Sequence, residues 1–352
     1  MKKPVFLKQQ MMLRVVYALI PVLLVSIYYF GWRVLALVGV SLIFAFLTEW
    51  ISTSYRGGRM SYAVYVTAML YGLSLPPTVP FWVAAVGAII AILFGKEVFG
   101  GFGKNPFNPA IVGRAFVYVS FPEDMTAQFV PVFRNFPAGL SKWSFSSLNE
   151  IPDYIKSAGL SKVDAISAAT PMWSRRDYGF ETSIEKLFTG NISGIFEHSG
   201  QNMVLSAGSA GEVCTIVIIL AAIYLIWTKT AKWQLTVSTI VGAVVLNVIL
   251  RNILGIQAVP PVLFTLFSGG LMYAAVFMVT DPISAPRNKI SQWIYGGMIG
   301  MLIVFFRYKA IFAGGVGFAI LMGNMFSPSL DLWIKRIKAR KKNKEAKNNE
   351  KE

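Results

Sequence analysis

Residues 12–30 read MLRVVYALIPVLLVSIYYF and residues 34–50 read VLALVGVSLIFAFLTEW, two apolar runs separated by only three residues. A helix that crosses the hydrocarbon core of a bilayer needs about 20 mostly apolar residues, and both runs approach this length. The same criterion finds eight further candidates, near residues 61–78, 80–95, 105–121, 210–228, 233–250, 260–280, 291–306 and 310–334. The sequence therefore predicts an all-α polytopic membrane protein with about ten transmembrane helices.

The composition of the 352-residue chain agrees with this prediction and excludes several classes of function. Hydrophobic residues make up 55% of the chain and charged residues 14%, whereas a soluble domain carries about 25% charged residues. Most lysines and arginines lie at the ends of apolar runs or in the C-terminal tail. They do not form the compact basic stripe of a nucleic-acid-binding surface, so we expect no nucleic-acid partner. Cys214 and His198 are the only residues of their types. We therefore expect that this chain by itself forms no Cys- or His-based metal, haem or iron–sulfur site. Any redox chemistry would then require an organic cofactor or partner subunits.

The distribution of lysine and arginine predicts the orientation in the membrane, because cytoplasmic loops carry the excess of these residues. With the N-terminus inside, the inside loops hold eight basic residues and the tail after residue 334 holds nine. The short outside loops hold four, which are Arg33, Arg251, Arg307 and Lys309. We therefore expect a multi-pass chain with both termini in the cytoplasm.

The spans divide the chain into four regions. Residues 1–121 form a first half of five helices, residues 122–209 a polar lobe on the outer (periplasmic or extracellular) face, residues 210–334 a second half of five helices, and residues 335–352 a basic cytoplasmic tail. Because the two halves start on opposite sides, a structural repeat between them would be inverted, a common plan among transporters. The tail has the charge to meet anionic membrane lipid.

The stretch GKNPFNPAIVGRAF at residues 103–116 combines an interrupted backbone with polar side chains. Two prolines remove amide donors at a helix start, and Asn105 and Asn108 supply donors and acceptors there. Arg114 follows one to two turns into the membrane, where an arginine is expensive and pairs with an anion or with carbonyl groups. Taken alone, the stretch is equally typical of a capped re-entrant turn with a snorkelling arginine.

Two further stretches carry polar groups in turn-forming contexts. TDPISAP at residues 280–286 places Asp281 where it could cap a helix, receive Arg287, or bind a cation or a ring nitrogen. DAISAATPM at residues 164–172, in the outer lobe, is a string of small residues that ends in Thr170. Either stretch alone is also typical of an ordinary turn.

Together, these motifs and the helix count resemble the flavin-bearing membrane subunit shared by two respiratory ion pumps. The family comprises the D subunit of the Rnf complex and the B subunit of the Na⁺-translocating NADH:quinone oxidoreductase. The resemblance extends from the residues near Gln10 to those near Pro328 and rests on the stretches at 103–116 and 280–286. About eleven residues precede the first span. The quinone-reducing protein has a longer N-terminal extension, so we favour the Rnf branch.

The resemblance implies a covalent FMN whose phosphate is esterified to a threonine in a pattern resembling Asp-x-x-Ser-Gly-Ala-Thr. In this chain the pattern is Asp164, Ser167, Ala168, Ala169 and Thr170, with Ala168 in place of the glycine. Small neighbours give a flavin transferase access to the hydroxyl, and Asp164 could steer its metal–phosphate assembly. The resemblance further implies a noncovalent riboflavin near the cytoplasmic side.

The functional hypothesis that the resemblance implies is a redox subunit of an ion-translocating ferredoxin:NAD⁺ oxidoreductase, in the plasma (inner) membrane of a bacterial or archaeal cell. Electrons would cross the membrane to FMN on Thr170 and drive transport of Na⁺ or H⁺, with Asn105, Asn108, Asp281 and Glu49 as candidate groups of the ion path. Expected partners are the other Rnf subunits, including a second FMN-bearing subunit on the outer face. The alternatives are the B subunit of the quinone-reducing pump, a non-redox channel or transporter with inverted repeats, and a scaffold for soluble partners.

Overall fold

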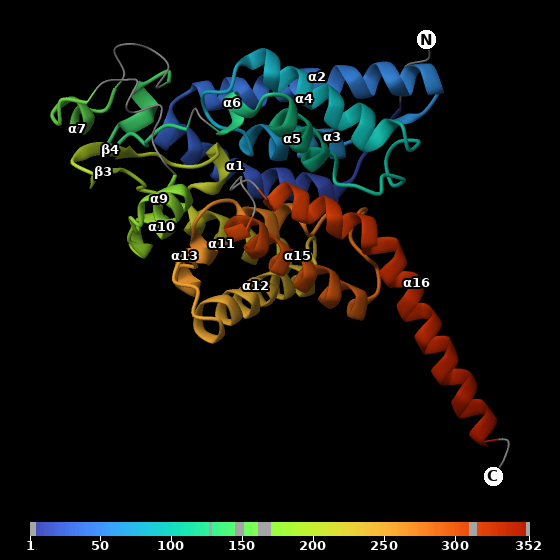
Figure 1. The fold of residues 1–352 in the computed structure, drawn as a ribbon. Helices are drawn as coiled ribbons and strands as arrows, with labels where there is room; N and C mark the ends of the chain where they lie inside the picture. The colour runs from blue at the N-terminus through green and yellow to red at the C-terminus, as the bar shows by residue number, and fades with distance from the viewer. Residues whose placement is uncertain (1–4, 127–128, 145–150, 161–169, 310–314, 350–352) are drawn as a thin grey trace.

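A computed structural model describes residues 5–126, 129–144, 151–160, 170–309 and 315–349. Its long helices run along one common direction, and the polar lobe lies at one end of them (Figure 1). The N-terminus and the C-terminal arm lie at the opposite end. Both chain ends therefore lie on one side of the helical body and the lobe on the other, as the charge distribution predicts.

The first half consists of five apolar helices connected by short turns. They are α1 (Gln10–Phe30), α2 (Arg33–Arg56), α3 (Ala63–Leu73), α4 (Phe81–Ile92), which continues as a π-helix over Leu93–Glu97, and α5 (Pro109–Ser120). Gly57 ends α2 in the left-handed conformation that favours glycine. Asn108 caps α5 by accepting a hydrogen bond from the Ala110 amide, and Pro109 takes the first helical position.

The second half contains α11 (Thr215–Trp227), α12 (Trp233–Val248), α13 (Val262–Phe267), α14 (Leu271–Tyr273), α15 (Lys289–Lys309) and α16 (Val316–Asn349). Two π-helical turns, over Ile249–Ile253 and Ala274–Met278, extend α12 and α14. The predicted span 260–280 is thus divided, because the chain breaks at residues 268–270 between α13 and α14. The third span of the first half is similarly short, since α3 ends before Pro76 and Pro77.

The lobe combines short helices with a β-hairpin that the all-α prediction did not include. Its helices are α6 (Pro122–Thr126), α7 (Asp153–Lys156), α9 (Pro171–Tyr178), α10 (Ile184–Thr189) and two 3₁₀ turns, Ala138–Ser141 and Ala210–Glu212. Strands β3 (Gly194–His198) and β4 (Gln201–Leu205) pair antiparallel around Ser199 and Gly200, which both have positive φ. At the other end of the molecule, β1 (Val5–Leu7) pairs parallel with β2 (Arg59–Ser61).

The two halves pack in corresponding ways. The second helix of each half packs on the fourth, which are α2 on α4 and α12 on α15. Across the halves, α1 contacts α11 and α5 contacts α16, which pairs the first and the fifth helices. These equivalent pairs, and a shortened third span in each half, agree with a five-plus-five repeat.

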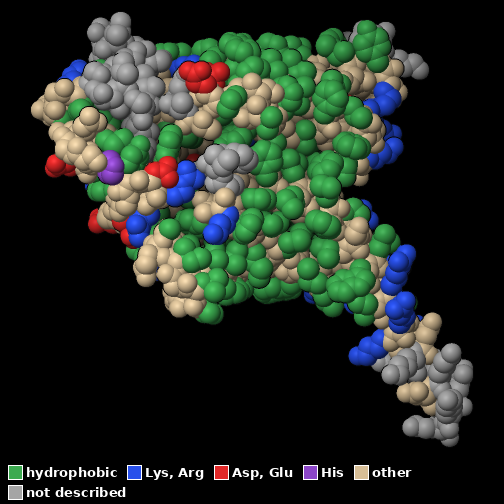
Figure 2. Space-filling model, in the orientation of Figure 1, with side chains coloured by type: hydrophobic (Ala, Val, Ile, Leu, Met, Phe, Trp, Pro, Cys, Tyr) green, Lys and Arg blue, Asp and Glu red, His purple; other side chains and the backbone are tan. Residues whose placement is uncertain are grey.

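Hydrophobic side chains cover the middle of the molecule on the face that Figure 2 shows, while charged side chains gather on the lobe and at the opposite end. Within the described part of the chain, four helices are by themselves long and apolar enough to cross a bilayer: Gln10–Phe30, Arg33–Arg56, Trp233–Ile253 and Lys289–Lys309. The molecule is therefore a predominantly helical polytopic membrane protein. The number of ten spans stays a prediction.

Candidate functional site

A cavity of about 330 Å³ lies where the lobe meets the membrane helices, and we call it the outer cavity. The walls come from segments far apart in the sequence, including α5, α9, the residues 208–213 and the break between α13 and α14. Residues that line it include Arg114, Thr170, Arg176, Glu212, Gly270 and Arg307. The fold thus brings two residues predicted for the site, Thr170 and Arg114, to one cavity.

Thr170 lies at the N-cap of α9, directly before Pro171. Its carbonyl accepts a hydrogen bond of 2.7 Å from the Ser174 amide, as the first bond of the helix requires. Its hydroxyl makes no capping bond and no hydrogen bond to any residue that the structure describes. An anionic group attached to this hydroxyl would lie at a helix N-terminus, where the peptide dipoles favour negative charge.

Residues 164–169 lie outside the described part of the structure. The predicted roles of Asp164, Ser167, Ala168 and Ala169 around the acceptor hydroxyl therefore stay predictions.

Arg307 contributes to the outer cavity in a way that the sequence analysis missed. The sequence places it in a short outside loop, yet it lies in the last turn of α15 and only 1% of its surface is exposed. Its Nη1 and Nη2 atoms donate to the carbonyls of Thr265 (2.7 Å) and Ser268 (3.0 Å), which are free because α13 ends there. The glycine pair at 269–270, inside an apolar run, was the available signal of this break.

The other charged groups of the outer cavity have different partners. Arg114 is half-buried, and its Nη2 donates to the Ser209 hydroxyl at 3.3 Å. Arg176 pairs with the neighbouring Asp177 at 2.8 Å. The Glu212 carboxylate accepts from the Ser209 amide at 2.9 Å and closes a capping box. Two arginines, Arg114 and Arg307, therefore line the cavity with no carboxylate of the described residues within ion-pair distance.

A second, much smaller cavity of about 50 Å³ lies toward the end of the molecule that carries the termini, and we call it the inner cavity. It is lined by Asn105, Asn108 and Asp281 together with Lys96, Phe102 and Thr280. The fold thus joins the predicted residues of the stretches 103–116 and 280–286, although Arg114 belongs to the outer cavity. The volume of the inner cavity is enough for water molecules or an ion, and the riboflavin expected near the cytoplasmic side stays a prediction.

Asn108 connects the two halves at the inner cavity. Its side chain is 3% exposed, and its Nδ2 donates to the Met278 carbonyl at 3.2 Å while its Oδ1 accepts from the Ala110 amide at 3.0 Å. Its own amide donates to the Asn324 side chain at 3.0 Å. Asn105 has a local role, because its Nδ2 donates to the Phe107 carbonyl at 2.9 Å.

Asp281 closes the turn that follows the eighth predicted span. Its carboxylate accepts from the Ser284 hydroxyl at 2.7 Å and from the Ile283 and Ser284 amides at 3.4 and 3.3 Å. Burial raises the pKa of this carboxyl, and the hydrogen bonds from Ser284 and Ile283 oppose the rise. Among the described residues it has no ion pair, so Arg287 is not its partner. Asp281 thus stabilises a turn and does not cap a helix, and its predicted roles in binding a cation or a ring nitrogen stay predictions.

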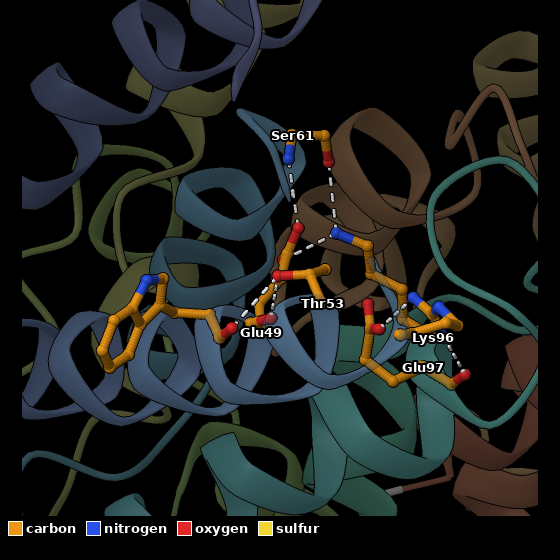
Figure 3. Close-up of polar contacts among 7 residues, drawn as sticks. Glu49, Thr53, Ser61, Lys96 and Glu97 are labelled. Atoms are coloured by element: carbon orange, nitrogen blue, oxygen red, sulfur yellow. Dashed lines mark hydrogen bonds and ion pairs between the residues drawn. The ribbon is translucent and has the colours of Figure 1, made fainter. Parts of the chain in front are cut away.

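Glu49 and Lys96 form a buried ion pair beside the inner cavity (Figure 3). Their side chains are 0% and 2% exposed, and Lys96 Nζ lies 2.6 Å from Glu49 Oε2. Ser61 donates its amide to Glu49 Oε1 at 3.1 Å and accepts from Lys96 Nζ at 3.1 Å with its hydroxyl. Glu97, the next residue of the same π-helix, pairs with Arg56 at 2.5 Å. Lys96 therefore links the wall of the inner cavity to a buried carboxylate.

Comparison with known proteins identifies the family. The chain matches the model of the NQR2, RnfD, RnfE family over residues 6–340. The chain belongs to this family. It is 29% identical over 350 residues to the D subunit of the ion-translocating oxidoreductase complex of Actinobacillus succinogenes, with 94% of this chain and 93% of that protein covered. The D subunit of the Haemophilus ducreyi complex is 32% identical over 340 residues, with 92% of each chain covered.

The same NQR2, RnfD, RnfE family includes a quinone-reductase branch. The B subunit of the Na⁺-translocating NADH-quinone reductase of Azotobacter vinelandii is 31% identical over 291 residues, which cover 81% of this chain and 63% of that protein. The alignment with this quinone-reductase protein is thus less complete than the alignments with the D subunits above.

Proposed function

We propose that this chain is the membrane subunit of an Rnf-type ion-translocating ferredoxin:NAD⁺ oxidoreductase and carries FMN covalently on Thr170. The observation that carries the proposal is the Thr170 hydroxyl, which makes no bond to the described residues and lines a cavity that also contains Arg114 and Arg307. Small-molecule sites have volumes of about 300–1,000 Å³, and the outer cavity, at about 330 Å³, falls in this range.

The residues of the outer cavity suit the two chemical parts of FMN. A phosphate ester on Thr170 would lie at the N-terminus of the eight-residue helix α9, which stabilises anions. The flavin ring would occupy the cavity, where apolar groups such as Met172 and Trp173 accompany the arginines. When bound, FMN supplies the ability to accept and release electrons. The protein then binds and orients the ring and excludes water from it.

We further propose that the lobe lies on the outer face and both termini in the cytoplasm, with Na⁺ or H⁺ as the transported ion. The positive-inside distribution supports this orientation, and the opposite placement of lobe and termini in Figure 1 accords with it. The polar groups around the inner cavity, Asn105, Asn108, Asp281 and the pair Glu49–Lys96, are the candidates for the inner part of the ion path. We assign no residue to riboflavin.

The alignments favour the Rnf type over the quinone-reducing type. The D subunits of Actinobacillus succinogenes and Haemophilus ducreyi align over more than nine tenths of both chains, whereas the quinone-reductase protein of Azotobacter vinelandii aligns over 63% of its own length. The purified complex should therefore pass electrons between ferredoxin and NAD⁺. Quinone reduction in its place would support the second type.

The experiment that tests the flavin site is fluorescence of the denatured polypeptide in a gel, after expression in a host with an active flavin transferase. Only a covalently bound flavin comigrates with the unfolded chain. We expect fluorescence in the wild type and none in the Thr170→Ala variant. The Thr189→Ala variant is the matched control, because Thr189 is an exposed lobe threonine outside the outer cavity.

Each other outcome points to a different conclusion. A wild-type chain without fluorescence would contradict the flavin proposal and favour the non-redox transporter. Fluorescence that persists in Thr170→Ala would show that the chain carries a covalent flavin on a residue other than Thr170.

A further inference from the structure

The outer cavity carries positive charge that the described residues do not neutralise. Of its three lining arginines, Arg176 is paired with Asp177. Arg114 bonds to a hydroxyl and Arg307 to two carbonyls. Glu212 is the one carboxylate among the described residues of the lining, and its charge acts on Arg307 from beyond ion-pair distance. Three arginines then face two carboxylates, Glu212 and Asp177, which leaves one positive charge in excess among the described residues. Burying an unbalanced charge is expensive, so this arrangement favours an anionic group in the cavity.

Arg307 is more deeply buried than Arg114, the other lining arginine with no carboxylate of the described residues within ion-pair distance. Two of its nitrogens cap the end of α13, while its Nε is buried without a hydrogen-bond partner among the described residues. Gly269, with a φ of +61°, allows the guanidinium to reach the cavity wall, because a Cβ at this position would lie 3.3 Å from Arg307 Nη2. The capping bonds therefore leave one guanidinium donor of Arg307 without a partner among the described residues.

The phosphate ester that we place on Thr170 would lie at the N-terminus of α9. The ring that we place in the cavity would supply a second anion, which forms only on reduction. Two electrons and one proton convert the oxidised ring to the reduced ring, with the proton on N5 and one negative charge shared by N1 and the C2 carbonyl. The oxidised ring is neutral, so cations near N1 and C2 stabilise the reduced form more than the oxidised form. We propose that Arg307 and Arg114 hold this end of the ring and set its midpoint potential. The inference rests on the proposed function, since it needs the flavin on Thr170.

The test is the midpoint potential of the Thr170-linked flavin in the purified complex, titrated with dithionite and followed by absorbance. The Thr170→Ala complex provides the spectrum to subtract, so that other flavins of the complex do not contribute. We expect Arg307→Gln and Arg114→Gln each to lower the preference for the reduced form about tenfold, which is about 30 mV for a two-electron couple. Arg307→Lys, which keeps the charge, should restore much of the loss.

The matched control is Arg251→Gln, which removes the same charge from the same predicted side of the protein but outside the cavity. Its potential should equal that of the wild type. If Arg307→Gln does not assemble, Arg114→Gln carries the test, because the guanidinium of Arg114 has a single hydrogen bond to the described residues, to a hydroxyl.

The outcomes separate this inference from the flavin site itself. Fluorescent variants whose potentials equal those of the wild type, or shift no more than in Arg251→Gln, would overturn the inference and leave FMN on Thr170 in place. A wild-type chain without covalent fluorescence would overturn both.

Discussion

At the scale of single residues, the buried pair of Glu49 and Lys96 shows how two charges depend on each other. Removing one partner of a buried pair leaves an uncompensated charge and costs roughly 3–5 kcal/mol, whereas replacing both with neutral groups is often tolerated. We therefore predict that Lys96→Met strongly lowers the resistance of the purified protein to unfolding by SDS. The double variant Glu49→Gln/Lys96→Met should recover most of the loss. A double variant as unstable as the single one would contradict the mutual dependence.

Asn108 offers a second prediction, because its two side-chain atoms have separate tasks. Asn108→Ser keeps an uncharged side-chain oxygen that can cap α5 and loses the amide donor to the Met278 carbonyl, while Asn108→Ala loses both. An N-cap contributes about 0.5–2 kcal/mol, and an unsatisfied buried group costs about 1–3 kcal/mol. The alanine variant should therefore lose more stability in the same SDS titration. Equal losses would mean that the cap contributes nothing.

The sequence could predict some of these residues and not others. Asn105 and Asn108 each directly precede a proline. Because proline interrupts helical hydrogen bonding, their position at a backbone interruption follows from the local sequence. Arg307 follows an apolar run like any arginine at a helix end, and its burial depends on the carbonyls of Thr265 and Ser268, which are distant in the sequence. No local pattern contains that information.

At the scale of elements, glycines set the contact between α12 and α15. A Cβ at Gly300 would lie 2.0 Å from the Thr239 carbonyl oxygen, and one at Gly242 would lie 2.2 Å from the Gly297 oxygen. Such small residues let backbones approach closely in a membrane, where packing drives helix association. The two helices therefore touch backbone to backbone.

We predict that Gly300→Leu separates α12 from α15 and abolishes the yield of folded protein, since overpacking already costs about 1–3 kcal/mol when side chains can adjust. The matched control is Gly39→Leu in the middle of α2, where a Cβ meets no atom of the described residues within 4 Å. Size-exclusion chromatography in detergent measures the outcome. A monodisperse Gly300→Leu variant would show that this contact is dispensable.

Hydropathy located the long helices well, because α1, α2, α12 and α15 each read as one apolar run. It did not locate the interruption between α13 and α14, since the chain remains apolar through the break. The hairpin of β3 and β4 was also missed, although Ser199 and Gly200 form its turn. Both features depend on how segments pair in three dimensions, which composition does not record.

At the scale of the whole molecule, the orientation can be tested with thiol labelling, because Cys214 is the only cysteine. In a Cys214→Ser background, we predict that Gln201→Cys in the lobe reacts with a membrane-impermeant maleimide in intact cells (spheroplasts if an outer membrane is present). Lys338→Cys in the C-terminal arm should react only after permeabilisation. Both positions are exposed in the structure, so access and not burial decides the labelling. The reverse pattern would contradict the proposed orientation.

The charge count predicts that the two termini lie on one side of the membrane and the lobe on the other. In the fold, the termini lie at one end of the helical body and the lobe at the opposite end (Figure 1). This agreement arises because Lys and Arg placement and helix connectivity are both properties of the linear sequence. The position of Thr170 beside Arg114 and Arg307 is different. It requires the lobe to fold back onto helices of both halves, and the sequence motifs did not predict that arrangement.

The length of α16 has a mechanical consequence. This helix runs without interruption from Val316 to Asn349, and its apolar part ends near Ile334. At 1.5 Å per residue, the remaining turns form a stiff rod that reaches about 20 Å past the apolar part. Electrostatic forces in cell-like salt fade over about 8 Å, and the six basic residues between 335 and 342 reach only about 12 Å past the apolar part when the rod stands upright. The layer of lipid headgroups takes up part of that distance, so these residues stay within reach of the headgroups. Residues 343–352 hold three lysines and three glutamates, so the sequence beyond Lys342 adds no net charge. The positive charge of the rod is therefore concentrated at its base, where anionic headgroups can hold the helix at a fixed depth in the bilayer.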